Sequence, residues 1–244
     1  MNKLLLLSML LMTASVVQGK RHYVGFDNTN SAPAGSEVIT KTTTAQLGAN
    51  LLSVLGPAPS YVPAPVSGDT VLIAWGRYYL TSELTIPAGV VVQGGYNPDA
   101  GTAFTRVYPG AVYPSGAPTF ANMTILDGNA FFTSSRADKH RVATVKGTLE
   151  TCYIRGGHTN ELSGTTPEKL YGGGLYVDGG TVVACIIRGN VANNITSRAT
   201  TPALGGGVYL TNNGKIYNSL ITNNMANGGY GVYGEAGCAI TNAT

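Results

Sequence analysis

One eight-residue pattern recurs three times in the second half of this chain. The segments ETCYIRGG, VACIIRGN and YNSLITNN begin at residues 150, 183 and 217, so they lie 33 and 34 residues apart. They align without gaps, and cysteine or serine shares one column while isoleucine shares another. Self-similarity at a fixed period of about 20–50 residues is the signature of a solenoid, because each repeat buries its apolar face only by stacking on its neighbours.

Two fainter copies and a second pattern extend the repeat. VVVQGG at 90–95 and TILDGN at 124–129 match the later part of the eight-residue pattern, while GGGLYV, GGGVYL and GYGVYG begin at residues 172, 205 and 229. All are short β-branched runs broken by Gly and Asn, without the 3.6-residue period of a helix. The repeat therefore predicts an all-β chain, folded as a single-stranded right-handed parallel β-helix over residues 68–244.

The parity of the side chains predicts where each coil turns. Around the second segment the inward positions are 182, just before it, and then 185 and 187, a step of three followed by a step of two. A straight strand alternates by two, so we expect a corner at Ala184. Cys152 and Cys185 then face inward as small apolar fillers of one stack rather than as a disulfide pair. Three asparagines that end segments are expected to form a hydrogen-bonded ladder: Asn129, Asn190 and Asn224.

The first 67 residues have the character of export and capping segments. Residues 1–19 carry one lysine, a short apolar run and small residues, which is typical of a signal peptide cleaved near Gly19. Residues 20–67 are expected to hold a helix within 42–56 that caps the first coil, and a Pro-rich linker at 57–67. One face of that helix is formed by four leucines: Leu47, Leu51, Leu52 and Leu55. We predict no transmembrane segment in the mature chain and a location outside a bacterial cell, secreted or on its outer surface.

Composition and residue spacing exclude several classes of function. The formal net charge is +3 and only 11% of the residues are charged, which argues against nucleic-acid binding. Three cysteines cannot form a fully paired disulfide framework, and the histidines lack metal-ligand spacing. Those histidines are His22, His140 and His158. No nucleophile–base grouping, phosphate loop or pair of catalytic aspartates is recognisable, so the sequence predicts no catalytic residue, metal or other cofactor.

One outward column of the predicted solenoid is the candidate ligand site. Alignment of the segments places five residues in it: Gln93, Asp127, Arg155, Arg188 and Thr222. Neighbouring coils bring Arg155 and Arg188 together, where like charges are unfavourable. Asp127 supplies a counter-charge, or an acidic sugar does, since guanidinium binds carboxylate in a bidentate manner. Tyr153 lies beside this column in an outward apolar stripe, which either is covered by the insertion loops or, if bare, is an interaction surface. The predicted ligand contacts are Gln93, Asp127, Tyr153, Arg155 and Arg188.

Several of these segments resemble known β-helical proteins. GDTVLIAWGRYYLTSELTIPAGVVVQGGYN, from residue 68, resembles the first coils of the pectin-lyase-like superfamily. TILDGN and the GGGLY and GGGVY coils are similar to the polymorphic outer-membrane-protein-type repeats of bacterial surface proteins. The resemblance covers residues 68–244 and implies the fold, but that superfamily includes lyases, hydrolases, adhesins and autotransporter stalks.

The resemblance also implies a groove. Polysaccharide lyases of this fold hold their substrate along a face with outward Arg, Lys and acidic residues, often with calcium. The insertions at 158–171 and 195–204 are expected to form one wall of such a groove beside the arginines. The cluster of acidic residues that a calcium site requires is absent from this column.

Three functional hypotheses follow. The leading one is a non-enzymatic adhesion or glycan-binding module at the cell surface or outside the cell. The alternative is a polysaccharide lyase acting on an acidic glycan, with Arg155 and Arg188 binding the uronate and Asp127 assisting. In the third, the chain is a fragment of a longer surface protein, because the solenoid ends in mid-coil at Thr244. The alternative reading of that end is that the last coil stays open and pairs with another chain.

Overall fold

The computed structural model describes residues 19–26, 37–40, 47–60, 63–97, 123–128, 139–159, 167–193 and 202–244. These residues are mostly β-structure, and their strands pair in parallel. The predicted signal peptide, except for Gly19, and the first asparagine of the predicted ladder, Asn129, lie outside the described residues.

The strands form four parallel sheets, and the members of each sheet are named in spatial order. The first sheet contains β2 (Glu37–Thr40), β1 (Arg21–Phe26), β3 (Thr70–Ala74), β6 (Val91–Tyr96), β9 (Thr148–Glu150), β13 (Thr181–Val183), β17 (Lys215–Tyr217) and β21 (Ala239–Thr241). The second contains β18 (Leu220–Thr222), β14 (Ile186–Arg188), β10 (Tyr153–Arg155), β7 (Thr124–Asp127) and β4 (Gly76–Tyr79). The third contains β11 (His158–Thr159), β15 (Val191–Ala192) and β19 (Met225–Ala226). The fourth contains β20 (Val232–Gly234), β16 (Val208–Thr211), β12 (Leu175–Asp178), β8 (Ala143–Val145) and β5 (Leu84–Ile86).

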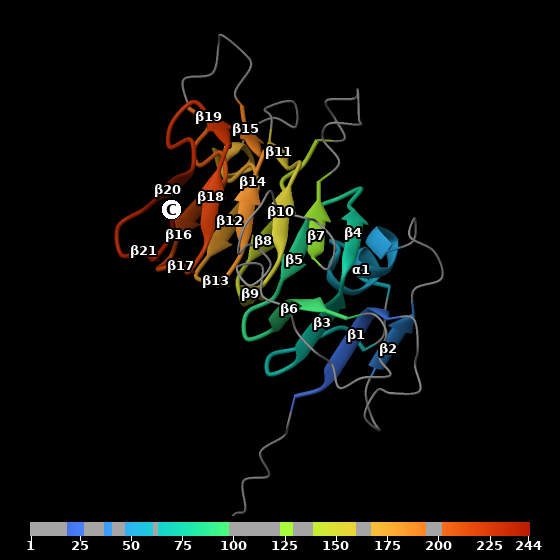
Figure 1. Cartoon of the computed structure of the whole chain (residues 1–244). Coiled ribbons are helices and arrows are strands. Elements are labelled where there is room, and N and C mark those ends of the chain that lie inside the picture. The colour runs from blue at the N-terminus through green and yellow to red at the C-terminus, as the bar shows by residue number, and fades with distance from the viewer. Residues whose placement is uncertain are drawn as a thin grey trace, which may run out of the picture.

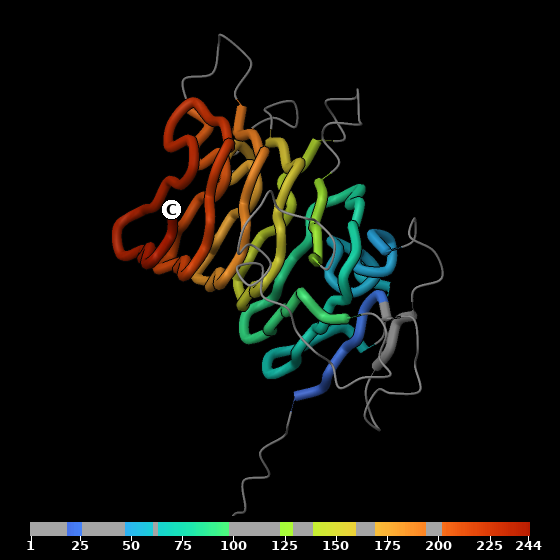
Figure 2. Tube along the Cα trace, in the orientation of Figure 1, coloured from blue at the N-terminus to red at the C-terminus, as the bar shows by residue number. Residues whose placement is uncertain are grey.

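The chain visits these sheets in a fixed rotation. From β9 onward it passes through the first, second, third and fourth sheets and then returns to the first (Figure 1). We call one such round a coil. Figure 2 shows the coils following one another in chain order, from the N-terminal to the C-terminal end. Each inner strand therefore bonds to the strand one coil before it and to the strand one coil after it.

The predicted aliphatic columns are confirmed. Val182 pairs in register with Leu149 on one side and Ile216 on the other, and all three are fully buried. In the second sheet Ile187 pairs with Ile154 and Ile221; Ile154 and Ile187 are buried in the same core cluster, and the partly buried Ile221 packs against it. Because each fully buried aliphatic side chain stabilises the fold by about 1.5–3 kcal/mol, these columns are the main apolar support of the stack.

The predicted corner at Ala184 is also confirmed. Its φ is 51°, and the residues of the same column in other coils, Thr151, Asn218 and Asn242, have φ values of 57°, 50° and 50°. Left-handed backbone is unfavourable for most residues and least so for Gly and Asn. A turn repeated in these four coils therefore follows the strand of the first sheet, and in three of them it leads the chain into the second sheet.

The cysteines behave as the parity predicts. Cys152 and Cys185 are buried, and none of the three cysteines, all of which lie in the described residues, forms a disulfide. Gly94 provides room for this stack, because a Cβ there would lie 2.7 Å from Cys152 Sγ.

Asn190 and Asn224 form the predicted ladder. Asn190 donates through Nδ2 to Asn224 Oδ1 at 3.0 Å and to the Ile154 carbonyl at 3.2 Å, and its Oδ1 accepts from Gly157 N at 3.0 Å. One coil later, Asn224 Nδ2 donates to the Ile187 carbonyl at 2.9 Å. Asn190 is fully buried, so these bonds satisfy groups that have no access to water.

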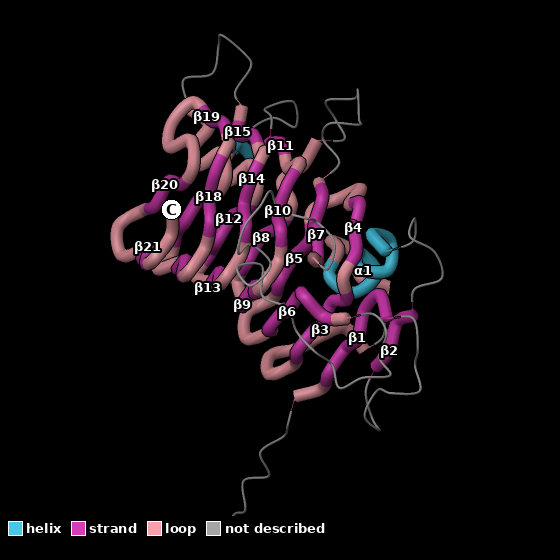
Figure 3. Tube along the Cα trace, viewed as in Figure 1, coloured by secondary structure: helices cyan, strands magenta, loops and turns pink. Residues whose placement is uncertain are grey.

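The helix α1 (Leu47–Leu55) matches the predicted cap (Figure 3). It packs against β4, β1 and β5, and Leu47, Leu51 and Leu55 are buried in the main core cluster, whereas Leu52 is only partly buried. The backbone of Gly48 comes so close to β4 that a Cβ there would lie 1.8 Å from the Tyr79 carbonyl oxygen. None of the helical segments in the described part of the chain has the length and apolar character needed to span a membrane.

The N-terminal segment contains more than the predicted cap and linker. Strands β1 and β2 extend the first sheet beyond β3, and β1 pairs with β3 from Arg21 to Val24. This segment lies outside the repeat, so its alternating residues RHYVGF were not recognised as a strand of the same sheet.

Because Asn190 is the centre of the asparagine ladder, its substitution should strongly reduce the stability of the fold. Asn190→Ala leaves Gly157 N and the Ile154 carbonyl without their bonds inside the core, and we expect it to lower the free energy of unfolding by about 2–3 kcal/mol. Urea denaturation of wild type and variant measures the change. The control is Asn193→Ala, at a half-buried asparagine whose side chain makes no hydrogen bond within the described residues, where we expect a change below about 0.5 kcal/mol. Equal losses at both positions would contradict the structural role of the ladder.

Candidate ligand-binding site

Asp127 lies at the centre of an ion cluster on the second sheet. Arg77 Nε and Nη2 donate to Asp127 Oδ2 at 2.8 Å and 2.5 Å, and Arg155 Nε lies 3.3 Å from the same oxygen. The Asp127 side chain is completely buried, whereas those of Arg77 and Arg155 are 29% and 28% exposed. Arg77 also stacks on the Tyr79 ring, 4.4 Å from its centroid. Asp127 thus acts as the internal counter-charge, the first of the two roles predicted for its column.

Arg188 has a different partner. With its amide oxygen turned toward the guanidinium, Asn223 accepts from Arg188 Nε at 3.2 Å and from Nη2 at 3.1 Å. Asn223 follows β18 on the next coil and has a φ of 52°. Since an amide leaves the charge of Arg188 uncompensated, and Arg188 is exposed, this residue is the more available cation of the predicted pair.

The predicted column is wrong at its first member. Gln93 lies in the first sheet, where it pairs with Leu72 and Glu150, whereas Asp127 lies in the second sheet and pairs with Tyr79 and Arg155. VVVQGG and TILDGN both combine β-branched residues with glycine, and this similarity concealed that they form strands of different sheets. The 34-residue spacing between Gln93 and Asp127 is therefore not the length of one coil.

The exposure predicted for Asp127 is also wrong, and of the two alternatives for the apolar stripe the covered one holds at Tyr153. Asp127 does not face solvent, because two guanidinium groups bind its carboxylate. Tyr153 is only 4% exposed and packs with Met123 and Ile125 in a small apolar cluster. The stripe that contains Tyr153 becomes exposed only toward the last coil, where Leu220 is 44% exposed.

The predicted groove wall is described only in part. Most residues of the 158–171 and 195–204 insertions lie outside the described ones, but the 3-10 helix Pro167–Leu170 is placed. Leu170 packs with Ala192, Ala203 and Ala226, next to the third sheet, and the Tyr171 ring stacks on Tyr209 of the fourth sheet at 4.4 Å. The described end of the first insertion therefore covers the third and fourth sheets.

The tyrosines of the second repeat pattern form an aromatic stack on the fourth sheet. Tyr209 stacks on Tyr176 and Tyr233 with centroids 5.5 Å and 5.4 Å apart. The Tyr209 hydroxyl donates to Glu235 Oε1 at 2.6 Å, and burial together with this carboxylate raises the pKa of Tyr209. Because most ring faces in this stack contact other rings, it is a structural element.

The donor set of the arginine column does not fit a calcium ion. Calcium requires about six to eight oxygen ligands, and here the buried carboxylate of Asp127 is flanked by two cations. Elsewhere in the described residues, no three His, Cys, Asp or Glu side chains gather in a way that suits a metal ion.

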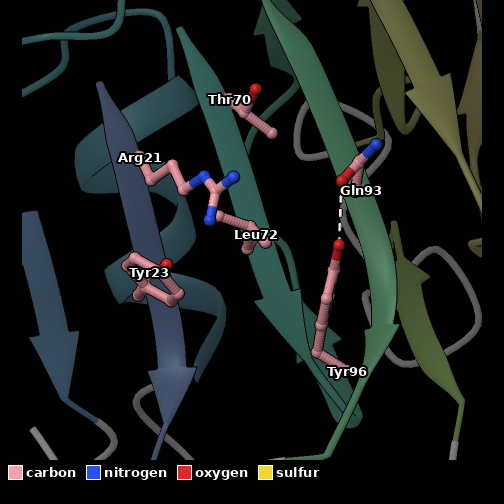
Figure 4. A pocket seen from close by; sticks show the side chains of 6 residues that line it. All are labelled: Arg21, Tyr23, Thr70, Leu72, Gln93 and Tyr96. Carbon is pink, nitrogen blue, oxygen red and sulfur yellow. Dashed lines mark hydrogen bonds between the residues drawn. The ribbon is translucent and has the colours of Figure 1, made fainter. Parts of the chain in front are cut away.

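A polar pocket lies on the outer face of the first sheet, around Gln93. Its volume is about 400 Å³, and it is lined by residues of β1, β3 and β6: Arg21, Tyr23, Thr70, Leu72, Gln93 and Tyr96. Figure 4 shows the Arg21 guanidinium reaching from β1 toward β3, while Tyr96 points back toward Gln93. The Tyr96 hydroxyl donates to Gln93 Oε1 at 2.9 Å, and Gln93 Nε2 donates to Glu150 Oε2 at 3.0 Å. This chain of bonds fixes the amide in the wall of the pocket.

Arg21 is the charged member of this lining, and it was not predicted from the sequence. It is exposed, and within the described part of the chain its guanidinium makes no hydrogen bond or ion pair. Arg21 pairs with Thr70, and Tyr23 pairs with Leu72. The register of β1 on β3 therefore places these four lining residues side by side. The available signal was the alternation in RHYVGF, which places Arg21 and Tyr23 on the same face of one strand.

Comparison with known proteins adds no assignment to this geometry. No protein-family model, curated protein or solved structure matches the chain.

The Asp127 cluster leads to a prediction on stability. Asp127→Asn removes the charge that holds Arg77 and Arg155 together, and we expect it to lower the free energy of unfolding by about 2 kcal/mol. Chemical denaturation measures the loss. The matched control is Asp178→Asn, because Lys146, its ion-pair partner at 3.3 Å, is half exposed, and we expect a change below about 0.5 kcal/mol. If Asp127→Asn is as stable as the control, Asp127 is not the counter-charge that stabilises this sheet.

The environment of His158 should make the stability of the folded protein depend on pH. Burial, aided by the charge of Lys139, lowers the pKa of His158 from 6.5 to about 4. Because the folded state resists protonation of this ring, protons favour the unfolded state as the pH falls from 6.5 toward 4. We expect the urea midpoint of wild type to decrease more over this interval than that of His158→Gln. Parallel pH profiles for the two proteins would refute this assignment.

Proposed function

We propose that the chain is an exported, non-enzymatic module that binds an acidic glycan, and that its coils form a right-handed parallel β-helix of the pectin-lyase-like kind. The rotation through parallel sheets supports this fold, since crossover connections between parallel strands are right-handed in about 98% of cases. Export rests on the signal-peptide character of residues 1–19.

The observation that carries this function is the pocket around Arg21. Its volume of about 400 Å³ falls in the range of small-molecule sites, about 300–1,000 Å³. A guanidinium is suited to a carboxylate, and the polar groups of Thr70, Gln93 and Tyr96 are suited to hydroxyl groups. A uronic acid combines both kinds of group on one ring. Among the residues predicted as ligand contacts, Gln93 belongs to this pocket, and Arg188 offers a second cation on the neighbouring sheet.

Binding without catalysis is favoured by the state of Asp127. In the alternative, a lyase, Asp127 was expected to assist at the uronate, but its carboxylate is buried and bound by Arg77 and Arg155. None of the described residues that line the pocket around Arg21 has an acidic side chain that would serve as a base. Incubating the protein with polyuronates and following the absorbance of new unsaturated ends tests the lyase directly. A steady increase in absorbance would show that the protein cleaves the glycan and would refute the proposal of binding without catalysis.

Binding is tested by substitution of Arg21. We expect Arg21→Gln to weaken the affinity for an oligogalacturonate at least about tenfold in calorimetric titration, because the bidentate contact to the carboxylate is lost. Lys215→Gln is the matched control: Lys215 is an exposed cation on the same sheet, in β17, outside the pocket, and its loss should change the affinity less than about twofold. Equal losses would indicate non-specific charge attraction, and a wild type that binds no acidic glycan would contradict the proposal.

A further inference from the structure

The start of β1 is held by a buried carboxylate. Asp69, which is 4% exposed, accepts from Lys20 N through Oδ1 at 2.7 Å and from Val66 N through Oδ2 at 3.0 Å. His22 Nε2, on a fully buried ring, lies 3.1 Å from Asp69 Oδ2. Burial alone would raise the pKa of Asp69, but the bonds from Val66 N, His22 and Lys20 N outweigh it and hold that pKa below its ordinary value. The protein thus stabilises a negative charge at this position.

The nitrogen nearest to this charge belongs to the peptide bond where the signal peptide is predicted to be cut. We propose that Asp69 and His22 form a receptor for the α-ammonium group that cleavage between Gly19 and Lys20 creates. In the cleavage, water adds to the Gly19 carbonyl carbon and the C–N bond breaks, leaving a carboxylate on Gly19 and an amine on Lys20. An α-amino group has a pKa of about 7.7–8.0 in model peptides, so it is largely protonated at neutral pH.

Cleavage changes the nature of the contact between Lys20 and Asp69. The amide N–H of an uncut chain is a neutral donor, whereas the ammonium group has three donors and a full positive charge. Both bonds are charge-assisted on the side of the ionised Asp69 carboxylate, but only the ammonium group carries a positive charge that balances the buried charge of Asp69. The contact at 2.7 Å requires no movement of β1 or β3 to become an ion pair.

The surroundings of Gly19 indicate the order of events. The uncut backbone runs so close to Gly68 that a Cβ at Gly19 would lie 1.7 Å from the Gly68 carbonyl oxygen. A peptidase cannot enclose a bond packed in this way, so cutting precedes the docking of β1 onto β3. After docking, Thr70 N donates to the Lys20 carbonyl at 2.9 Å and begins the pairing of β1 with β3. The proposal concerns folding and maturation, and it holds whether or not the pocket around Arg21 binds a glycan.

The first test compares one protein before and after release of its N-terminus. A removable tag ending in Gly19 is joined to Lys20, and the melting temperature is measured with the tag attached and after a protease has freed Lys20. We expect release to raise the melting temperature by about 3–6 °C in wild type and by less than about 1 °C in Asp69→Asn. An equal increase in both proteins, or none in wild type, would overturn the proposal.

A second measurement needs no variant and remains informative if Asp69→Asn does not fold. The released wild-type protein is treated briefly with an acylating reagent at pH 7, and modification of the Lys20 α-amine is followed by mass spectrometry. We expect this amine to react at least about tenfold more slowly in the folded protein than in urea, because the ion pair withholds the neutral form that reacts. Equal rates would refute the receptor role of Asp69. Expression of the full chain with its leader completes the test, since a mature N-terminus at any residue other than Lys20 would also overturn the proposal.

Discussion

The structure depends on the in-register parallel pairing of strands that lie one coil apart. This pairing places like side chains directly above one another, as Leu149, Val182 and Ile216 show. It also satisfies the backbone of each inner strand on both sides, so a coil is stable only between two neighbours. The corner residues with positive φ and the ladder of Asn190 and Asn224 both follow from it, because they repeat at the same place in successive coils.

The ends of this stack are treated differently from its middle. At the N-terminal end α1 packs against β4 and β5, while β1 and β2 extend the first sheet, so that among the described residues several elements share this end. The polar pocket exists because the first sheet is extended in this way: Arg21 and Tyr23 come from β1, and Gln93 and Tyr96 come from β6. The candidate site is therefore produced by the part of the chain that departs from the repeat.

What could be predicted from sequence alone follows the same division. The strand columns, the corner at Ala184 and the buried cysteines were predictable, because three well-matched copies of one segment define a register. The pairing of Gln93 was not, since residues 97–123 separate β6 from β7 and break the regular spacing. Nor was the ion cluster, because Arg77 reaches Asp127 from a strand 50 residues earlier. Short similar segments identify a repeat, but they do not show which side chains of neighbouring coils meet.

The connections between the third and fourth sheets differ in length while the sheets do not. The chain uses residues 193–207 to pass from β15 to β16 but only 227–231 from β19 to β20, and Tyr209 still stacks in register on Tyr233. The length of the connection between the third and fourth sheets can thus vary without a change in the strands of the coil. An insertion into this connection that spares Ala203 and Gly205–Gly207, which are buried or bonded to the next coil, would leave the strand columns and the pocket on the first sheet in place.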